Sequence, residues 1–276
     1  MLFATWNVNS IRTRLSQVEE FLDETQPDLL CLQETKVEDK LFPRESIEKR
    51  GYQVSFYGQK AYNGVALISN QKLDDIRLGI SGELVNNQVS TFLDEQKRII
   101  SALINGIRVV NVYVPNGSSL DSEKYIYKLK WLDHLKKYFE SQEERSEPLC
   151  LMGDFNIVLE EKDIHNPKRF NNGIMASLSE REALQNVLGT RLEDVFRLFE
   201  ADTGHWSWWD YRSGAWQKDQ GWRIDHIYLS EELINNARSC VIHKKARGNI
   251  QPSDHAPVLV DINWPPQEDN ENSLFY

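Results

Sequence analysis

A run of residues that is apolar on both faces constrains the fold of this chain most strongly. Residues 29–32, Leu-Leu-Cys-Leu, follow one another without a polar side chain, which is typical of a β-strand buried between two layers. The run ends in the polar group Gln33-Glu34-Thr35-Lys36. We therefore expect a sheet that is covered on both sides and that displays functional groups where its strands end.

The rest of the chain alternates predicted strands with predicted helices. Apolar residues at helical spacing predict a first helix, with Asn9 or Ser10 as its N-cap. The dipeptide Asn105-Gly106 predicts a tight hairpin, and hairpins favour antiparallel pairing. Further helices are predicted over residues 122–139, 179–188 and 192–199, and strands over residues 2–8, 54–57, 64–69, 98–104, 107–114, 149–152, 224–229 and 257–260.

This order of elements predicts the α+β class. We expect a four-layer α/β-sandwich in which two mostly antiparallel sheets pack face to face with helices outside. Because no linker divides the chain, a single domain is predicted over residues 1–276, ending in an acidic tail from about residue 265. With 40% hydrophobic residues, a chain of this length can bury the necessary core.

Charge and cysteine content narrow the class of protein. A formal net charge of −10 argues against a protein that coats nucleic acid by charge alone, because contacts of lysine and arginine with phosphate dominate such binding. Cys31, Cys150 and Cys240 are far apart in the sequence, which favours reduced, structural thiols. No signal segment or bilayer-spanning apolar run is found. We expect a monomeric cytoplasmic protein without membrane contact, associated with the nucleoid if its source is prokaryotic.

Polar residues end or interrupt several of the predicted strands. A single carboxylate in such a place is usually a helix cap or a ligand for backbone amides. Recurrence at corresponding strand ends instead indicates side chains that meet in one site. The residues of this kind are Asn7, Glu34, Asp154, Asn156, Asp225, Asp254 and His255.

These residues lie in short motifs that together resemble the endonuclease/exonuclease/phosphatase superfamily. The resemblance runs in order over nearly the whole chain, so it is more specific than any one motif. The motifs are Trp6-Asn7-Val8-Asn9, Leu32-Gln33-Glu34-Thr35-Lys36, Tyr113-Val114-Pro115-Asn116, Gly153-Asp154-Phe155-Asn156, Arg223-Ile224-Asp225 and Ser253-Asp254-His255. More narrowly, Gln96-Lys97-Arg98-Ile99-Ile100 and Trp208-Trp209-Asp210-Tyr211-Arg212-Ser213 resemble the exonuclease III type of apurinic/apyrimidinic (AP) endonuclease.

The resemblance implies a metal-dependent hydrolase of phosphodiesters. Such hydrolysis needs a hard cation at the phosphate, a group that deprotonates water, and donors for the phosphate oxygens. Oxygen ligands suit Mg²⁺, for which Mn²⁺ can substitute, and the cysteine and histidine spacing of a zinc site is absent. The implied metal ligands are Glu34 first, Asn7 beside it, Asp254 directly or through water, and the pair Asp154 and Asn156.

The same resemblance implies catalytic roles. Asp154 would deprotonate the attacking water, and Asn156 would hold that water or a phosphate oxygen; the two-residue spacing puts both on one face if the strand continues. A protonated His255, paired with Asp225, would donate to the phosphate. Tyr113 would place its hydroxyl near the same phosphate, as a donor or, with a depressed pKa, as a charged group. The alternative for Tyr113 is a core position.

Residues outside this set would determine the substrate, because the superfamily also cleaves small phosphodiesters. Trp208, Trp222 and Ile224 match positions that in the family form the walls of the pocket for a base-free sugar. The loop Gly117-Ser118-Ser119 lacks an arginine that a eukaryotic member carries there, so we expect a weaker grip on the product strand. Candidate DNA contacts are Arg12, Lys36, Arg98, Asn116, Asn166, Asn171 and Arg212.

The leading hypothesis is therefore a DNA repair enzyme that incises double-stranded DNA 5′ to abasic sites. Exonuclease activity in the 3′–5′ direction and cleaning of blocked 3′ ends are expected as related activities. Two alternatives stay open. A phosphodiesterase or phosphatase of the same fold that acts on small molecules would lack basic residues flanking the site. A catalytically inactive DNA-binding module would lack part of the metal and water set, and no member is missing.

Overall fold

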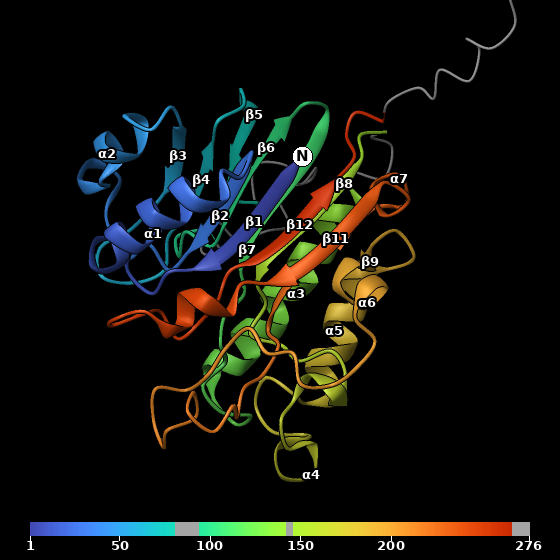
Figure 1. Ribbon diagram of the computed structural model, residues 1–276. Helices are drawn as coiled ribbons and strands as arrows, with labels where there is room; N and C mark the ends of the chain where they lie inside the picture. The colour runs from blue at the N-terminus through green and yellow to red at the C-terminus, as the bar shows by residue number, and fades with distance from the viewer. Residues whose placement is uncertain (81–93, 142–145, 267–276) are drawn as a thin grey trace, which may run out of the picture.

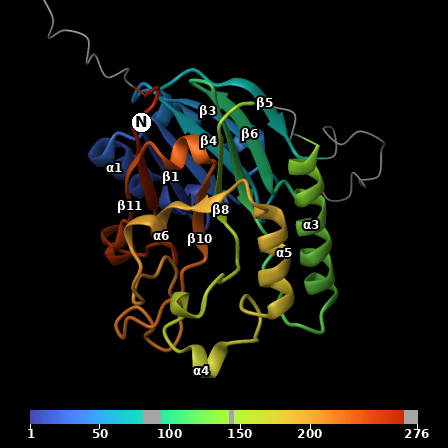
Figure 2. The ribbon, with the colours of Figure 1, turned by 90° about the vertical axis from the view of Figure 1, so that its right-hand side faces the viewer.

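The structure is a computed structural model, and it describes residues 1–80, 94–141 and 146–266. Its strands form two sheets that pack face to face, with helices on the outer faces (Figures 1 and 2). This is the α+β sandwich that the order of elements predicts. The acidic tail predicted from about residue 265 lies almost entirely outside the described residues.

Strand and helix bounds follow the predicted ranges closely. The first sheet contains β1 (Leu2–Asn7), β2 (Leu29–Gln33), β3 (Gln53–Tyr57), β4 (Val65–Ser69), β11 (Ala237–Ile242) and β12 (Val258–Ile262). The second contains β5 (Asp74–Leu78), β6 (Ile99–Ile104), β7 (Ile107–Tyr113), β8 (Leu149–Asp154), β9 (Glu193–Asp194) and β10 (Asp225–Leu229). The α-helices are α1 (Ile11–Thr25), α2 (Arg44–Glu48), α3 (Glu123–Glu140), α4 (Pro167–Phe170), α5 (Leu178–Leu188), α6 (Val195–Phe199) and α7 (Glu231–Ile234).

Both sheets are mixed. The strand orders are β11-β12-β1-β2-β4-β3 and β5-β6-β7-β8-β10-β9. One pair in each sheet is parallel, β1 with β2 and β7 with β8, and the remaining pairs are antiparallel. The two parallel pairs lie in the middle of their sheets, where strands are buried on both faces. The apolar run from Leu29 is such a strand.

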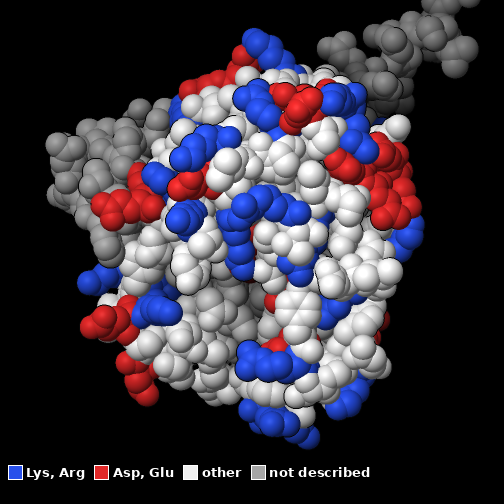
Figure 3. All heavy atoms as spheres, turned by 90° about the vertical axis from the view of Figure 1, so that its left-hand side faces the viewer, with Lys and Arg blue, Asp and Glu red and all other residues white. Residues whose placement is uncertain are grey.

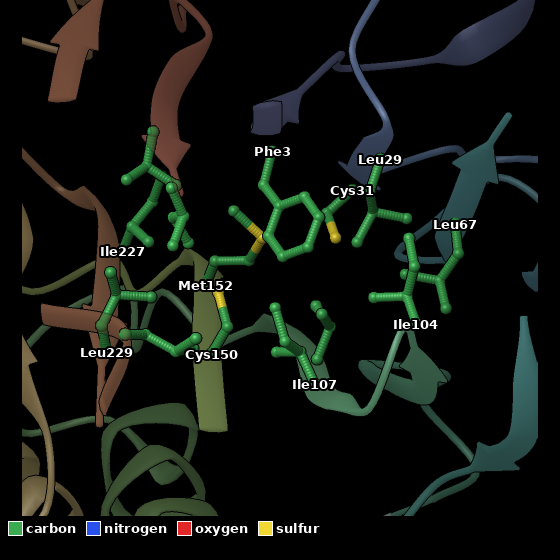
Figure 4. Close-up of a cluster of buried hydrophobic side chains, with 14 of the residues drawn as sticks. Phe3, Leu29, Cys31, Leu67, Ile104, Ile107, Cys150, Met152, Ile227 and Leu229 are labelled. Carbon is green, nitrogen blue, oxygen red and sulfur yellow. The ribbon is translucent and has the colours of Figure 1, made fainter. Parts of the chain in front are cut away.

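Apolar side chains from both sheets form the central core (Figure 4). Phe3 and Cys31 of the first sheet face Met152 and Ile227 of the second, and all four are fully buried. Burying a large apolar side chain is worth roughly 1.5–3 kcal/mol, so this layer is a main source of stability. The three cysteines are free and buried, as predicted.

Helices cover the outer faces of the sandwich. Trp6 and Phe21 pack together where α1 lies on the first sheet, with ring centroids 5.6 Å apart. Helices α3 and α5 lie side by side on the second sheet, where Trp131 and Leu184 are buried (Figure 2). Within the part of the chain that the structure describes, no helix is long and apolar enough to cross a membrane.

The structure differs from the prediction at residues 192–199 and in several short or exposed elements. The helix predicted over residues 192–199 is the short strand β9 followed by helix α6, which begins only at Val195. The short helices α2, α4 and α7 were not predicted. The edge strands β5 and β11 were not predicted, because most of their side chains are exposed or half-exposed and leave no apolar pattern. Ser10 occupies the N-cap position of α1, but its side chain makes no capping hydrogen bond. The side chain of Asn9 does not cap the helix either, and instead hydrogen-bonds Asp254 and Lys36.

The register of the strands gathers their polar ends. Asn7 pairs with Gln33 at the end of β1 and β2, so Glu34 follows directly beside Asn7. In the second sheet Asp154 pairs with Tyr113 on one side and with Asp225 on the other. The functional groups predicted at strand ends therefore lie at one end of each sheet.

Candidate active site

Three titratable side chains from distant parts of the chain meet at the ends of the strands. Glu34 follows β2, Asp154 ends β8, and His255 precedes β12. One ligand-type atom from each lies within 4.8 Å of the others. Only 1% of Asp154 and 4% of His255 is exposed, so water screens their charges little. The structure thus brings together the residues that the sequence predicted to share a site.

Asn7 lies between the two carboxylates. Its side-chain nitrogen donates to Glu34 Oε1 and to Asp154 Oδ2, each at 2.8 Å. Its oxygen Oδ1 accepts a hydrogen bond from the backbone N–H of Asn9 at 3.0 Å. Asn7 therefore acts here as a donor that holds the carboxylates together, and the expected role as a metal ligand needs the opposite amide orientation.

Glu34 forms a close ion pair with Lys36, whose Nζ lies 2.7 Å from Glu34 Oε2. Burial alone would raise the pKa of Glu34, but Lys36, Asn7 and His255 outweigh burial, and the net pKa is lowered. Glu34 is therefore ionised at neutral pH. Lys36 also donates to Asn9 Oδ1 at 2.5 Å, so its ammonium group contacts the site itself.

A tight turn joins Asp154 and Asn156. The strand does not continue through Asn156, which has a left-handed φ of 49°, so the condition for both side chains to share one strand face is not met. Instead, the backbone N–H and Nδ2 of Asn156 donate to Asp154 at 2.9 and 3.1 Å. Burial, together with the charges of Asp225 and Glu34, raises the pKa of Asp154 to about 7 against the opposing charge of His255.

His255 is held by the carboxylate of Asp225. Its Nδ1 lies 2.8 and 3.1 Å from the two oxygens of Asp225, and its Nε2 lies 3.8 Å from Asp154 Oδ2. Burial alone would lower the pKa of His255, but Asp225, Asp154 and Asp254 together raise it to about 10. The imidazole is therefore charged at neutral pH, as the sequence analysis expects, and Nε2 carries a proton toward the site.

Asp254 is held by two donors. Asn9 Nδ2 donates to its Oδ1 and Trp208 Nε1 donates to its Oδ2, both at 3.0 Å. Burial raises the pKa of Asp254, but His255 and these two donors outweigh it, and the net pKa is lowered. Among the described residues, the compact group of ligand-type atoms does not include Asp254, which fits a contributor that acts through water.

Tyr113 stays protonated. Burial, followed by the charge of Glu34, raises its pKa well above the ordinary value, so the predicted alternative of a charged phenolate is wrong. The guanidinium of Arg98 stacks 4.6 Å from the centre of the Tyr113 ring. Arg98 also donates to the carbonyl of Tyr113 at 3.2 Å and to Gln96 at 2.9 Å. It supports Tyr113 from the protein side, and only 9% of it is exposed for the predicted DNA contact.

An aromatic wall lies next to His255. Trp208 and Trp222 meet edge to face with ring centroids 6.1 Å apart, and Trp208 also bridges to the backbone of His255. Ile224 belongs to the same cluster but is only 1% exposed, so Trp208 and Trp222 supply most of the wall. Met175 joins this cluster as well, and no sequence motif had pointed to it.

A cleft of about 630 Å³ opens beside Tyr113. Its lining includes Asn116, Ser118 and Lys124. Gly117 and Ser118, from the loop predicted to bind the product strand weakly, therefore line this open cleft. On the face shown in Figure 3, lysine and arginine side chains lie above and below a hollow. A negatively charged chain therefore still presents positive charge near a depression in its surface.

The other residues predicted to contact DNA differ in their exposure and in their hydrogen-bond partners. Arg12 is exposed, and Arg212 is 88% exposed, with Nε 3.2 Å from Asp210. Asn166 caps α4, and Asn171 donates to Glu161 at 2.6 Å. Asn116 donates to Asn156 Oδ1 at 2.9 Å, so it belongs to the site itself.

The sequence did not predict that Asn9 and Arg14 take part in the site. Asn9 links Asp254 to Lys36, and its place in the motif Trp6-Asn7-Val8-Asn9 was the available signal. Arg14 donates to the carbonyls of Asn9 and Pro252, tying α1 to the loop before His255. No side-chain pattern predicts that role, because both partners are backbone carbonyls and that of Pro252 is far along the chain.

The donor set fits a hard divalent cation. Glu34 and Asp154 converge with carboxylate oxygens, the ligands that Mg²⁺ prefers. His255 lies close to these carboxylates but is not a metal ligand, because a protonated imidazole has no lone pair for a metal. The carboxylates can therefore hold a cation while the histidine faces the substrate.

Comparisons with known proteins agree with this geometry. The model of the "Endonuclease/Exonuclease/phosphatase family" matches residues 4–255. Exodeoxyribonuclease III of Haemophilus influenzae is 37% identical over 274 residues, covering 95% of this chain and 100% of that protein. The structure of a 3′ phosphatase from Neisseria bound to a product DNA hairpin has a TM-score of 0.90 and 36% identity, covering 96% of this chain and 100% of that chain. An AP endonuclease from Archaeoglobus fulgidus has a TM-score of 0.88 and 35% identity, covering 95% and 99%.

Proposed function

The chain belongs to the endonuclease/exonuclease/phosphatase family, and on that basis we propose that it is a metal-dependent hydrolase of DNA phosphodiesters. Its main reaction is incision of duplex DNA 5′ to an abasic site, which leaves a 3′-hydroxyl group. Removal of nucleotides or blocking groups from 3′ ends uses the same site. The observation that carries the proposal is the meeting of Glu34, Asp154 and His255 beside the aromatic wall of Trp208 and Trp222.

Each side chain contributes a separate step to hydrolysis. Asp154, with its raised pKa, accepts a proton from the attacking water, and Asn156 holds that water through its amide. His255 donates from Nε2 to a non-bridging phosphate oxygen, and Asp225 keeps its ring charged and oriented. Tyr113 donates a hydrogen bond from its hydroxyl group to an oxygen of the same phosphate. The water oxygen bonds to phosphorus as the bond between phosphorus and the 3′ oxygen breaks, and the 3′ oxygen takes up a proton from solvent to leave as the 3′-hydroxyl group.

Glu34 and Asp154 would hold the metal, with Glu34 as the first ligand. Asp254 would contribute through water. When bound, Mg²⁺ supplies positive charge that offsets the negative charge on the phosphate. We propose Mg²⁺ as the ion because all the protein donors are oxygens, and we expect Mn²⁺ to substitute for it.

The aromatic wall supports DNA as the substrate. An abasic nucleotide turned out of the duplex can lie against Trp208 and Trp222, whereas a nucleotide that carries its base is larger. The DNA-bound structure of the similar Neisseria protein supports a DNA partner. We propose that the chain acts as a cytoplasmic monomer, and its reduced, buried cysteines agree with that compartment.

The test is incision of a labelled duplex that carries one abasic site. We expect cleavage with Mg²⁺, almost none with a chelator, and losses of several orders of magnitude for Asp154→Asn and Glu34→Ala. Asp74→Asn changes an exposed carboxylate far from the site and is the matched control. An intact duplex with folded wild-type protein and Mg²⁺ would reject the proposal.

The same samples separate the two alternatives. A small-molecule phosphodiesterase would hydrolyse bis(p-nitrophenyl) phosphate faster than it incises the duplex. An inactive DNA-binding module would retain the labelled duplex in a gel-shift experiment without cutting it under any metal condition. The meeting of Glu34, Asp154 and His255 in one group argues against the inactive module, because binding of DNA alone does not need it.

A further inference from the structure

A buried ion pair lies behind the active site, and we propose that this pair, Lys128 with Glu180, positions the three loops that form the site. Lys128 is on α3 and Glu180 is on α5, and both side chains are fully buried. Neither side chain takes part in the mechanism above. The inference rests on the proposed function only for what the loops do, since the contacts themselves are in the structure.

Lys128 uses all three of its N–H donors on partners inside the protein. Its Nζ donates to Glu180 Oε1 at 2.5 Å, to the carbonyl of Asn156 at 2.8 Å and to the carbonyl of Asn116 at 3.2 Å. One ammonium group therefore fixes the backbone of the loop after β7 and of the loop after β8.

These two backbone positions control a chain of side-chain amides. Asn116 Nδ2 donates to Asn156 Oδ1 at 2.9 Å, and Asn156 Nδ2 donates to Asp154 Oδ2 at 3.1 Å. A shift of either carbonyl moves the amide that holds the attacking water relative to the carboxylate that accepts its proton. Lys128 thus acts on Asp154 through two asparagines, as a positioning residue.

Glu180 extends the same control to a third loop. Its Oε1 accepts from the backbone N–H of Met175 at 3.0 Å, and its Oε2 accepts from the backbone N–H and hydroxyl of Ser177 at 3.1 and 2.6 Å. Met175 packs in the aromatic cluster with Trp222. The pair therefore ties the wall of the pocket to the loops that carry the catalytic amides.

Stability alone does not account for a charged pair at this place. A buried ion pair loses its hydration, and apolar side chains of similar volume often stabilise a protein as well or better. The neighbouring helix positions are already apolar and buried, including Trp131 and Leu135. The ammonium group does what an apolar side chain cannot, because it holds two loop carbonyls in fixed positions.

The experiment compares Lys128→Met with the double variant Lys128→Met/Glu180→Gln, which removes both charges. We expect kcat on the abasic duplex to fall about 10- to 100-fold in both, as for a small misplacement of reacting groups. KM should change little, because the exposed basic residues are untouched. The melting temperature should fall most in the single variant, where a buried carboxylate loses its partner, and recover partly in the double variant.

Leu135→Ala is the control for lost stability. Leu135 lies two turns further along α3, is fully buried and touches none of the three loops through hydrogen bonds. Below its melting temperature it should keep the wild-type kcat despite a lower melting temperature. If kcat instead follows the melting temperature across all variants, the pair is only structural and the proposal is overturned.

Hydrogen exchange gives a second readout that needs no activity. In the double variant, peptides covering residues 115–118, 154–158 and 171–177 should exchange faster than in the wild type, and those of the central strands should not. Unchanged exchange in these loops would overturn the proposal. An inactive wild-type protein with this exchange pattern would reject the proposed function and keep the positioning role.

Discussion

At the scale of single residues, Asp225 influences two catalytic groups at once. It is the main cause that raises the pKa of His255 against the effect of burial. It also adds to burial in raising the pKa of Asp154. The active protein needs Asp154 deprotonated and His255 protonated, so activity should fall where acid protonates Asp154 and where base deprotonates His255.

Replacing Asp225 with Asn should shift this window to lower pH. Both pKa values fall when the negative charge is lost, so the acidic limb of kcat/KM and the basic limb both move downward. The maximum should also drop, because the hydrogen bond that His255 Nδ1 donates to the oxygens of Asp225 is weakened. The measurement is kcat/KM against pH at saturating Mg²⁺, with Asp74→Asn as control. Limbs that stay fixed, or move in opposite directions, would contradict this account.

The sequence predicted which residues meet but not how each is held. Motif order placed Glu34, Asp154 and His255 in one site, and the structure brings them together. The turn at Asn156 and the protonation state of Tyr113 were left open by the sequence. The turn depends on the left-handed backbone of Asn156, and the pKa of Tyr113 depends on its burial and on Glu34 beside it. No local sequence pattern encodes either one.

At the scale of elements, an ion-pair network anchors the start of β10, which carries Asp225. Arg223 donates to Asp163 at 2.7 and 3.1 Å and to Asp194 at 2.7 Å. These contacts join the 3₁₀ helix Glu161–Asp163 and β9 to the strand that presents Asp225 to His255. The site therefore depends on buried charges outside it.

Because of this network, the free energy of unfolding should fall at acidic pH. Burial raises the pKa of Asp163, but Arg223, His226 and Arg197 outweigh burial, and the net pKa is lowered. A lowered folded-state pKa adds stability above the unfolded value of about 3.9, and this stability is lost as pH falls through the folded value. Asp163→Asn should cost about 3–5 kcal/mol at pH 7.

Urea unfolding between pH 7 and pH 3 tests this expectation. The difference in free energy of unfolding between wild type and Asp163→Asn should shrink as the pH falls below about 4. Asp202→Asn changes an exposed carboxylate and should show almost no difference at either end of this range. A cost for Asp163→Asn that is the same at both ends of the range would show that charge is not the cause.

Prediction of elements succeeded where burial leaves a clear pattern. Central strands such as β2 and β8 are apolar at nearly every position, and the amphipathic α3 matches its predicted range within one residue at each end. The edge strand β5 has mostly exposed side chains, and its pairing with β6 comes from backbone hydrogen bonds that composition does not reveal.

At the scale of the whole molecule, the packing of the two sheets holds the carboxylates of Glu34 and Asp154 close together, where a cation can bind. An ion that binds only the folded state stabilises it by mass action, by about 2.7 kcal/mol at 100 times its dissociation constant. For a domain of this size each kcal/mol raises the melting temperature by about 2–4 °C. Mg²⁺ should therefore raise the melting temperature, and a chelator should reverse the rise.

Glu34→Ala should abolish most of this response, because it removes the first ligand. Asp74→Asn should keep it. Differential scanning calorimetry with and without Mg²⁺ decides the matter without any substrate. A Glu34→Ala variant that responds like the wild type would place the ion elsewhere in the molecule.

The position of charge, rather than its total of −10, should control binding of DNA. Each phosphate contact contributes about 0.9 to the slope of log affinity against log salt. Lys168 and Arg169 are exposed on α4, which extends from the aromatic cluster, whereas Lys136 and Lys137 lie in the last turns of α3.

Lys168→Met/Arg169→Met and Lys136→Met/Lys137→Met change the net charge equally. If α4 contacts phosphates, only the first pair should weaken binding of a catalytically inactive Asp154→Asn protein to the abasic duplex, and its salt slope should fall by up to about 1.8. Fluorescence anisotropy over a range of KCl concentrations measures both slopes. Equal slopes for the two double variants would mean that the overall charge matters and the position of α4 does not, because both double variants remove two positive charges.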